Sequence, residues 1–340
     1  MTNIPIDRTA EMQRDIDFTI CKIIDTKLND YPSDYRKMID YQMGLDDHQG
    51  TTRSKGKRLR PLFVLLSCDL FDEDWHVSLP AAAAVELLHN FSLVHDDIQD
   101  GSETRRGRET IWKKWGVAQA INVGDALLNL AFIAILDSKG KLEDKNISNL
   151  LYCLQNTCLL LTKGQHLDIA FEKETLIPLS RYWQMIEGKT AALISACFEI
   201  GSIVAGAKNQ DRKLVAEFGN NIGLAFQVQD DYLGIWGDEI KTGKSAFSDL
   251  MSRKKTYPVI RGLENKLTFA SSWLSNAIID NDTARELAFT LETEGVKQEV
   301  IDKYKELYTS AWINLDQLNC EQIKKSRIHE TVKELEKRTK

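Results

Sequence analysis

Residues 80–100 read PAAAAVELLHNFSLVHDDIQD. Pro80 followed by four alanines is typical of a helix start, because a proline in the first turn gives up no helical hydrogen bond. The apolar residues after it recur at spacings of three and four, which predicts a helix that extends to Val94. His95 and a group of aspartates follow at once. The stretch therefore predicts an apolar helix with an acidic C-terminal end.

The same helical period continues on both sides of this stretch. The predicted helices are Arg58–Leu70, Pro80–Val94, Ala118–Leu136, Ile147–Phe171, Arg181–Ala205 and Lys213–Asp231. Polar segments rich in turn residues predict loops at Asp47–Gly56, Gly101–Thr110 and Gly234–Lys255. Strand-like alternation is nearly absent, which predicts an all-α fold. Without a repeat or linker, we expect a single helical domain over residues 1–340, with a motif-bearing core at about 50–265 and C-terminal helices at 266–340.

Composition and charge exclude several classes of protein. A net charge of −6 argues against nucleic-acid binding. Six cysteines are scattered without a CxxC pair, which argues against a disulfide framework or a zinc site. The first twenty residues carry charges throughout and lack the apolar core of a secretory signal. Polar residues interrupt the most apolar stretches, Val117–Leu136 and Ala191–Gly206, so we expect no membrane span and a cytoplasmic location.

The aspartates at the end of the first quoted helix are the strongest chemical signal. Asp96 and Asp100 lie one turn apart on one helix face, and Asp97 lies beside them. Carboxylates this close repel one another, and the helix dipole disfavours anions at a C-terminus. A divalent cation would remove the conflict, and Mg²⁺ prefers oxygen ligands.

A second acidic group closes another apolar helix, in the sequence QVQDD at 227–231. Gln227 precedes Asp230 by one turn and shares its face. Each group alone is more often a solvated helix end than a metal site. Because the arrangement occurs twice, and a basic loop follows each group, the sequence favours metal binding by Asp96, Asp97, Asp100, Asp230 and Asp231.

Basic residues surround these acidic groups. The segment GKRLRP at 56–61 precedes the first group, and Arg105 and Arg106 follow it. The planar arginine fork binds phosphate with two hydrogen bonds, and lysine supplies a point charge. Lys57 and Arg60 share a helix face, although a solvated basic helix start would look the same. Lys189, Lys244, Lys254 and Lys255 add further donors, and no P-loop pattern is present.

Eight segments, in order, carry a family resemblance. They are GKRLRP, LLHNFSLVHDDIQD, RRGRET, VGDALL, KGQHLD, EGKTAAL, FQVQDDYLGIWGD and KKTYP, between about Gly56 and Pro258. This ordered set resembles the trans-isoprenyl diphosphate synthases, also called polyprenyl synthetases, and most of all the geranylgeranyl diphosphate synthases. The resemblance implies a helical isoprenoid synthase bundle with a central substrate cleft, and a homodimer. It also implies condensation of isopentenyl diphosphate with dimethylallyl, geranyl or farnesyl diphosphate.

The resemblance assigns roles residue by residue. It implies that the five aspartates hold up to three Mg²⁺ ions together with bound diphosphate, that Mn²⁺ can substitute, and that Lys189 joins them in catalysis. For isopentenyl diphosphate the matching residues are Lys57, Arg60, His89 and Arg106. For the allylic diphosphate they are Arg105, Lys189, Thr190, Gln227, Lys244 and Lys254. Gln165 and Asp168 resemble a cavity-lining pair.

Two features bear on the product and on the metal. The family's second acidic motif usually ends in a third aspartate, and this chain has Gly234 there, so we expect activity with a weakened third metal. Upstream of Asp96, the aromatic Phe91 is expected to act as the floor of the product pocket, with the small Ser92 beside it and Leu88 a turn further back. This pattern resembles enzymes that make geranylgeranyl diphosphate.

Other readings of the sequence remain. A farnesyl or longer-chain synthase would share every motif. A class I terpene cyclase would not need the set of Lys57, Arg60 and His89, and a non-catalytic synthase subunit would not need intact acidic groups. A helical scaffold with merely solvated aspartates would gain no stability from magnesium and diphosphate.

Overall fold

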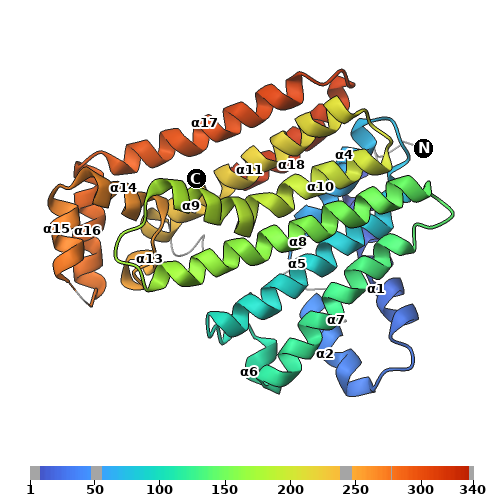
Figure 1. Cartoon of the computed structure of the whole chain (residues 1–340), viewed down its shortest axis with the longest axis horizontal. Coiled ribbons are helices and arrows are strands. Elements are labelled where there is room, and N and C mark those ends of the chain that lie inside the picture. The colour runs from blue at the N-terminus through green and yellow to red at the C-terminus, as the bar shows by residue number, and fades with distance from the viewer. Residues whose placement is uncertain (1–7, 47–55, 238–246, 277, 337–340) are drawn as a thin grey trace, which may run out of the picture. The chain divides into compact units, whose positions relative to one another are not determined.

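The computed structural model describes residues 8–46, 56–237, 247–276 and 278–336. Nearly all regular structure in these ranges is helical (Figure 1). The helices are α1 (Arg8–Lys27), α2 (Ser33–Met43), α4 (Leu59–Leu70), η1 (Trp75–Ser78), α5 (Leu79–Gln99), α6 (Ile111–Trp115), α7 (Val117–Leu136), α8 (Asp144–Glu172), α9 (Leu179–Ile186), η2 (Glu187–Ala191), α10 (Ala192–Val204), α11 (Asn209–Trp236), α13 (Ser248–Met251), α14 (Tyr257–Asn265), α15 (Thr268–Ser275), α16 (Asn281–Thr293), α17 (Val296–Asp316) and α18 (Gln322–Glu336). Two short strands, β1 (Thr104–Arg105) and β2 (Arg108–Glu109), pair antiparallel. The predicted all-α class is confirmed.

Several predicted boundaries need correction. The helix predicted to end at Val94 extends through the acidic residues to Gln99, and the helix predicted to end at Asp231 extends to Trp236. The predicted helix Arg181–Ala205 is interrupted by the π-helical turn η2. The predicted loop Gly101–Thr110 contains the β1–β2 hairpin, and the predicted loop Gly234–Lys255 contains the end of α11 and all of α13. Most of the predicted loop at 47–56 lies outside the described residues.

The chain divides into two compact units. The first unit contains Met1–Cys158 and Ala196–Lys213, and the second contains Leu159–Ser195 and Leu214–Lys340. Helices α8, α10 and α11 contribute residues to both units. That the whole chain forms one domain stays a prediction, and each unit is described by itself.

Helix α5 is the central helix of the first unit. Its residues from Pro80 to Leu88 are all buried, and the four alanines leave room for neighbouring helices to pack closely. Helix α7 packs alongside it, and Gly124 makes this possible because a Cβ there would lie 2.3 Å from Nε2 of His95. At the start of α4, the buried guanidinium of Arg58 donates to Glu86 on α5 at 2.7 Å. The acidic end of α5 is therefore fixed by a packed core.

The second unit has its own core, built around buried aromatic residues. Three large aromatic side chains are almost completely buried: Tyr182 on α9, Tyr257 on α14 and Trp273 on α15, with relative exposures of 0%, 2% and 1%. Tyr182 and Tyr257 pack ring to ring at 5.7 Å, and Trp183 contacts both. Helices α16 and α17 complete this core with Leu287, Leu291 and Val300. The core positions the C-terminal part of α11.

Two stretches are long and apolar enough to span a membrane by length and composition alone. They are Trp75–Gln99, which includes α5, and Val117–Leu136, which is α7. In their most apolar windows, 72% of the first and 44% of the second are buried inside the structure. A core helix of this kind passes the same test, so the finding is weak evidence for a span. The absence of a membrane span and the cytoplasmic location stay predictions.

Candidate active site

The first acidic group lies at the C-terminal end of α5. The side chain of Asp97 is 3% exposed and that of Asp96 is 21% exposed, whereas Asp100 caps the helix and is exposed. Arg105 on β1 donates to Asp97 Oδ1 at 2.8 Å and to Asp96 Oδ2 at 3.2 Å. Burial raises the pKa of Asp97 to about 6. Arg105 lowers this pKa, whereas the negative charges of Asp96 and Asp100 raise it further. The group is thus rich in oxygen donors and short of positive charge.

Three of the four predicted isopentenyl diphosphate residues, Arg60 on α4, His89 on α5 and Arg106 in the β1–β2 hairpin, lie close enough to interact. Arg60 Nη1 lies 3.3 Å from Nε2 of His89. A Cβ at Gly56 would lie 2.6 Å from Nη1 of Arg106, so a larger residue would displace the guanidinium; the φ of +71° at this position also favours glycine. Burial, followed by the charges of Arg60 and Arg106, lowers the pKa of His89 well below its ordinary value. The imidazole is therefore neutral at pH 7. The fourth residue predicted to bind this substrate, Lys57, precedes α4 and is exposed.

The second acidic group is held by hydrogen bonds within the second unit. Asp231 is buried, and its Oδ2 accepts from the hydroxyl of Tyr182 at 2.7 Å and from the backbone N–H of Tyr257 at 2.9 Å. Its Oδ1 accepts from Nε2 of Gln227 at 3.0 Å, and Thr190 Oγ1 donates to Gln227 Oε1 at 2.7 Å. Burial raises the pKa of Asp231 to about 7, although these donors act in the opposite direction. Thr190, Gln227 and Asp231 thus form one connected chain of hydrogen bonds.

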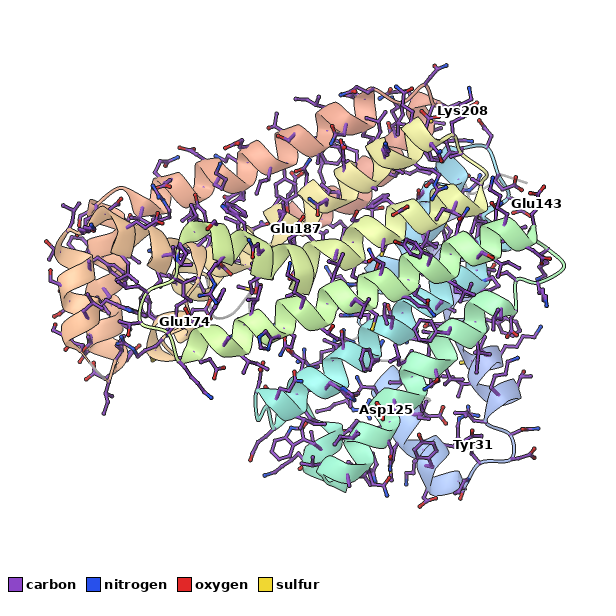
Figure 2. The ribbon with its side chains drawn as sticks, in the orientation of Figure 1. Tyr31, Asp125, Glu143, Glu174, Glu187 and Lys208 are labelled. Carbon is purple, nitrogen blue, oxygen red and sulfur yellow. The ribbon has the colours of Figure 1, made fainter. Side chains whose placement is uncertain are left out.

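Lys189 and Thr190 lie on the π-helical turn η2, whose first residue, Glu187, is labelled in Figure 2. A π-helical turn widens the helix and often occurs at functional sites. Glycines allow α8 to approach this turn: a Cβ at Gly164 would lie 2.1 Å from the backbone N of Lys189, and one at Gly188 would lie 2.6 Å from the carbonyl oxygen of Leu160. The Lys189 ammonium donates to Asp168 on α8.

The remaining predicted residues have distinct positions. Gln165, one turn before Asp168, has a buried Nε2 with no hydrogen-bond partner among the described residues. Lys254 is exposed after α13, and Lys244 lies outside the described residues. On α5, Phe91 is 8% exposed and its ring meets the His95 ring edge-on at 4.8 Å, whereas Ser92 donates to the backbone of His89. Leu88 is fully buried.

The side chains of each acidic group are of the kind that binds magnesium together with a phosphorylated ligand. Both acidic groups supply carboxylate oxygens, and the raised pKa values of Asp97 and Asp231 show buried carboxyls with too little compensating charge. Within the described ranges, no three acidic, histidine or cysteine side chains converge closely enough to hold a metal ion by themselves. Because Mg²⁺ is usually bound by one or two carboxylates, with water and substrate phosphates completing the shell, the magnesium site stays a prediction.

Sequence reasoning missed three residues of this site. Tyr182 and Tyr257 fix Asp231 but carry no recognisable chemical motif, although Tyr257 belongs to the quoted segment KKTYP. Asp249 lies in a segment that was predicted to be loop, and it contacts α11 at Gly234. Only the three-dimensional packing reveals these contacts.

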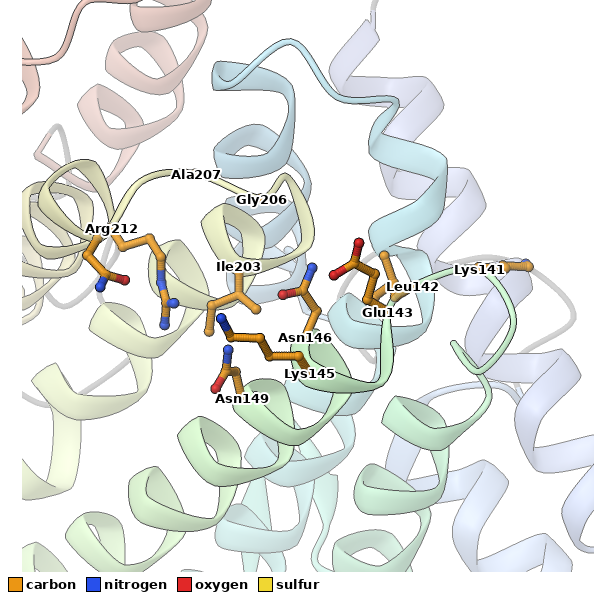
Figure 3. Close-up of a pocket in the computed structure, with 11 residues that line it drawn as sticks. Lys141, Leu142, Glu143, Lys145, Asn146, Asn149, Ile203, Gly206, Ala207 and Arg212 are labelled. Atoms are coloured by element: carbon orange, nitrogen blue, oxygen red, sulfur yellow. The ribbon is translucent and has the colours of Figure 1, made fainter.

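A separate polar cavity of about 670 Å³ lies in the first unit (Figure 3). Its lining includes Lys141, Glu143, Lys145, Asn146, Asn149 and Arg212. Lys145 and Arg212 extend into it, and Glu199 already pairs with Arg212 at 3.3 Å. None of the predicted site residues lines this cavity, so it is distinct from the acidic groups.

Comparison with known proteins places these features in a family. The model of the polyprenyl synthetase family matches residues 47–291. This covers more than half of the chain, and the chain therefore belongs to the polyprenyl synthetase family. The resemblance seen in the sequence is confirmed.

Individual relatives are similar over much of the chain. A (2E,6E)-farnesyl diphosphate synthase of Mycobacterium bovis is 43% identical over 226 residues, which are 66% of this chain and 62% of the relative. A geranylgeranyl diphosphate synthase of Saccharolobus solfataricus is 37% identical over 252 residues, which are 74% of this chain and 72% of the relative. The matched region thus spans less than two thirds of the mycobacterial relative's length.

Solved structures share the fold. A geranylgeranyl pyrophosphate synthetase from Pyrococcus horikoshii is 31% identical, and the match covers 96% of both chains with a TM-score of 0.86. A polyprenyl synthetase from Streptomyces coelicolor is also 31% identical, and the match covers 97% of this chain and 99% of that chain with a TM-score of 0.82.

Proposed function

We propose that this protein is a prenyltransferase that joins isopentenyl diphosphate to an allylic diphosphate and releases diphosphate. The starters are dimethylallyl, geranyl and farnesyl diphosphate, and the end product is geranylgeranyl diphosphate. The observation that carries the proposal is that two groups of aspartates, on the C-terminal parts of α5 and α11, each adjoin the basic and amide residues that the resemblance assigns to diphosphate binding. Membership in the polyprenyl synthetase family supports the same reaction.

Magnesium would be held by Asp96, Asp97, Asp100, Asp230 and Asp231, where it would neutralise the charge that builds up on a departing diphosphate. Arg105 donates to two of these carboxylates, and it would bind a diphosphate held by magnesium beside them. Lys189 and Thr190, on the widened turn η2, and Gln227 would orient the allylic diphosphate. Fixed groups of this kind stabilise developing charge without having to reorganise during the reaction.

Isopentenyl diphosphate would bind to Lys57, Arg60 and Arg106, with His89 beside them. Because His89 is neutral, it can donate one hydrogen bond to the diphosphate without adding charge to a site that already holds three cations. The allylic C–O bond then breaks, and the alkene of isopentenyl diphosphate attacks the resulting carbocation. The new tertiary cation loses a proton to the released diphosphate, which restores a double bond.

Incubation with magnesium, isopentenyl diphosphate and each allylic starter tests this proposal when the products are separated by chromatography. We expect a twenty-carbon diphosphate from every starter. A hydrocarbon formed from an allylic diphosphate alone would identify a cyclase, and absence of any product would identify a non-catalytic subunit or a scaffold.

A farnesyl diphosphate synthase is the second candidate. The specific observation in its favour is the 43% identity to the mycobacterial farnesyl diphosphate synthase. In that case the same incubation yields a fifteen-carbon product, and farnesyl diphosphate is not extended. A homodimer is also proposed from the family resemblance, and light scattering of the purified protein measures it.

A further inference from the structure

Arg58 stands between Lys57 and Arg60, the two residues of the segment GKRLRP that the resemblance assigns to isopentenyl diphosphate. It caps α4 with φ 48° and ψ 38°, in the left-handed region that residues other than glycine rarely adopt. Backbone strain of this kind costs energy, persists only where the surrounding contacts enforce it, and is concentrated at functional sites. The contacts of Arg58 are therefore the ones that hold this part of the chain in place.

The Arg58 side chain joins three helices to the start of α4, and it is only 4% exposed. Its Nη1 donates to Oε1 of Glu86 on α5 at 2.7 Å, and its Nε donates to Oδ1 of Asp17 on α1 at 3.1 Å. Its Nη2 donates to the backbone carbonyl of Met43, the last residue of α2, at 2.7 Å. A lysine could not reach all three acceptors, because its donors share a single nitrogen atom.

The partner carboxylate, Glu86, is buried to the same extent and is itself held in place. Its Oε1 also accepts from Nδ2 of Asn90, one turn later on α5, at 3.1 Å. Gln42 on α2 donates in turn to Oδ1 of Asn90 at 3.4 Å. Removing one partner of a buried ion pair leaves an uncompensated charge, which is far more costly than the loss of a surface pair. A buried network thus fixes the position of Arg58.

This network lies next to the residues predicted to bind isopentenyl diphosphate. Glu86 precedes His89 by three residues on α5 and shares its helix face. Burial lowers the pKa of Arg106 and that of Arg60, and the negative charge of Glu86 acts in the opposite direction on both. Because the interaction between charges falls with distance, Glu86 lies near both guanidinium groups.

The backbone of the same segment is fixed from α1, where Gln13 donates to the backbone carbonyl of Lys57 at 3.2 Å. We propose that Arg58 and Glu86 are positioning residues of the proposed isopentenyl diphosphate site. Their buried contact holds the strained start of α4, so that Lys57 and Arg60 are presented together to the diphosphate. In this role neither Arg58 nor Glu86 contacts the substrate. This inference rests on the proposed function.

Steady-state kinetics of the full chain, with isopentenyl diphosphate and the allylic diphosphate varied in turn, tests this inference. Arg58→Lys keeps the charge but removes the fork, and Glu86→Gln keeps the size of the side chain but removes its charge. Arg8→Gln is the matched control. Arg8 also joins α1 to α4, but it does so through Asp69 at 2.6 Å, at the opposite end of α4.

We expect Arg58→Lys and Glu86→Gln each to raise the KM for isopentenyl diphosphate by about 10-fold to 100-fold, since misplacing a binding group by about 1 Å can cost on the order of 100-fold. The KM for the allylic diphosphate and the value of kcat should change little, and Arg8→Gln should match the wild type. Thermal unfolding shows whether each variant is folded. If both buried variants are unstable, Asp17→Asn weakens only the more exposed contact and should raise the same KM to a smaller extent.

An unchanged KM for isopentenyl diphosphate in the folded variants would show that the pair only stabilises the fold, and it would overturn the inference while leaving the proposed function intact. Equal rises in both KM values would also overturn it, because they would indicate a general disturbance of the protein. If the wild type does not consume isopentenyl diphosphate at all, the proposed function fails, and the positioning role fails with it.

Discussion

Asp231 shows how a single buried carboxyl can serve both the fold and the site. Tyr182, Tyr257 and Gln227 all donate to it, so its position is fixed before any ligand binds. Burial nevertheless makes its ionised form costly, and its pKa rises to about 7. A carboxyl held in this way is preorganised for a cation that would offset its negative charge.

The raised pKa predicts how stability depends on pH in the absence of metal. Since the folded state holds the Asp231 proton up to about pH 7, whereas the unfolded chain releases it near 4, raising the pH across this range removes stability. An asparagine at 231 cannot titrate. The stability difference, wild type minus Asp231→Asn, should therefore fall by on the order of a few kcal/mol from pH 4 to 7 and then level off.

Unfolding of both proteins by heat or denaturant, in buffers that contain a chelator, measures this difference. Loss of hydrogen bonds in the variant adds an offset that is the same at every pH, so only the slope is diagnostic. Two curves that stay parallel from pH 4 to 7 would show that the carboxyl is not destabilised by burial.

At the scale of elements, the π-helical turn η2 depends on its contact with α8. A methyl group at Gly164 would meet backbone atoms of Gly188 and Lys189, which cannot rotate away. We expect Gly164→Ala to destabilise the protein by about 1–3 kcal/mol, the usual cost of overpacking. Because the turn carries Lys189 and Thr190, the KM for the allylic diphosphate should also rise, while that for isopentenyl diphosphate changes little.

Steady-state kinetics with each substrate varied in turn measures this effect. Lys163→Ala is the matched control, since the neighbouring side chain on α8 is exposed. If Gly164→Ala leaves both KM values unchanged, the packing of α8 on η2 does not position the allylic site.

Helix α5 carries the prediction for product length. Phe91 lies between one and two turns before Asp96, buried against the His95 ring. Phe91→Ala should remove the floor of the product pocket and shift the product to longer chains, at a cost in stability of about 3–5 kcal/mol. Chromatography of the products measures this change. Phe198→Ala removes another buried phenylalanine of the first unit and should lose stability without changing product length.

The helices themselves follow from sequence because apolar spacing records which face is buried. The ends of α5 and α11 were predicted too early, because the apolar pattern stops at the acidic residues and the helix dipole disfavours carboxylates there. The turn η2 leaves no spacing signal, since a π-helical turn shifts the register by a single residue. It depends on the close approach of Gly164 and Gly188, which only packing shows.

The residues of the candidate site could be predicted from the sequence, whereas their contacts could not. The five aspartates were singled out because two acidic groups recur at helix ends, each followed by a basic loop, and the roles of the basic residues came from the family resemblance. That these residues form one active site stays a prediction. The sequence could not show that Arg105 would pair with Asp96 and Asp97, or that Asp249 would approach Gly234 from α13. Both contacts join segments whose relative position is set by the tertiary fold.

For the molecule as a whole, charge is the central physical problem. The chain carries a net charge of −6, and both proposed substrates are anionic diphosphates. Long-range repulsion therefore opposes binding, and it must be offset locally by Arg60, Arg105 and Arg106 and by bound magnesium. The proposed reaction requires divalent ions, because without these ions the carboxylates of the two acidic groups would repel the diphosphate.

Release of inorganic diphosphate by the purified chain tests this account most directly. It should be measured with isopentenyl diphosphate and an allylic diphosphate together, with each alone, and with or without a magnesium chelator. We expect rapid release only when both substrates and magnesium are present. Equal release from the allylic diphosphate alone, or release that continues unchanged after chelation, would contradict it.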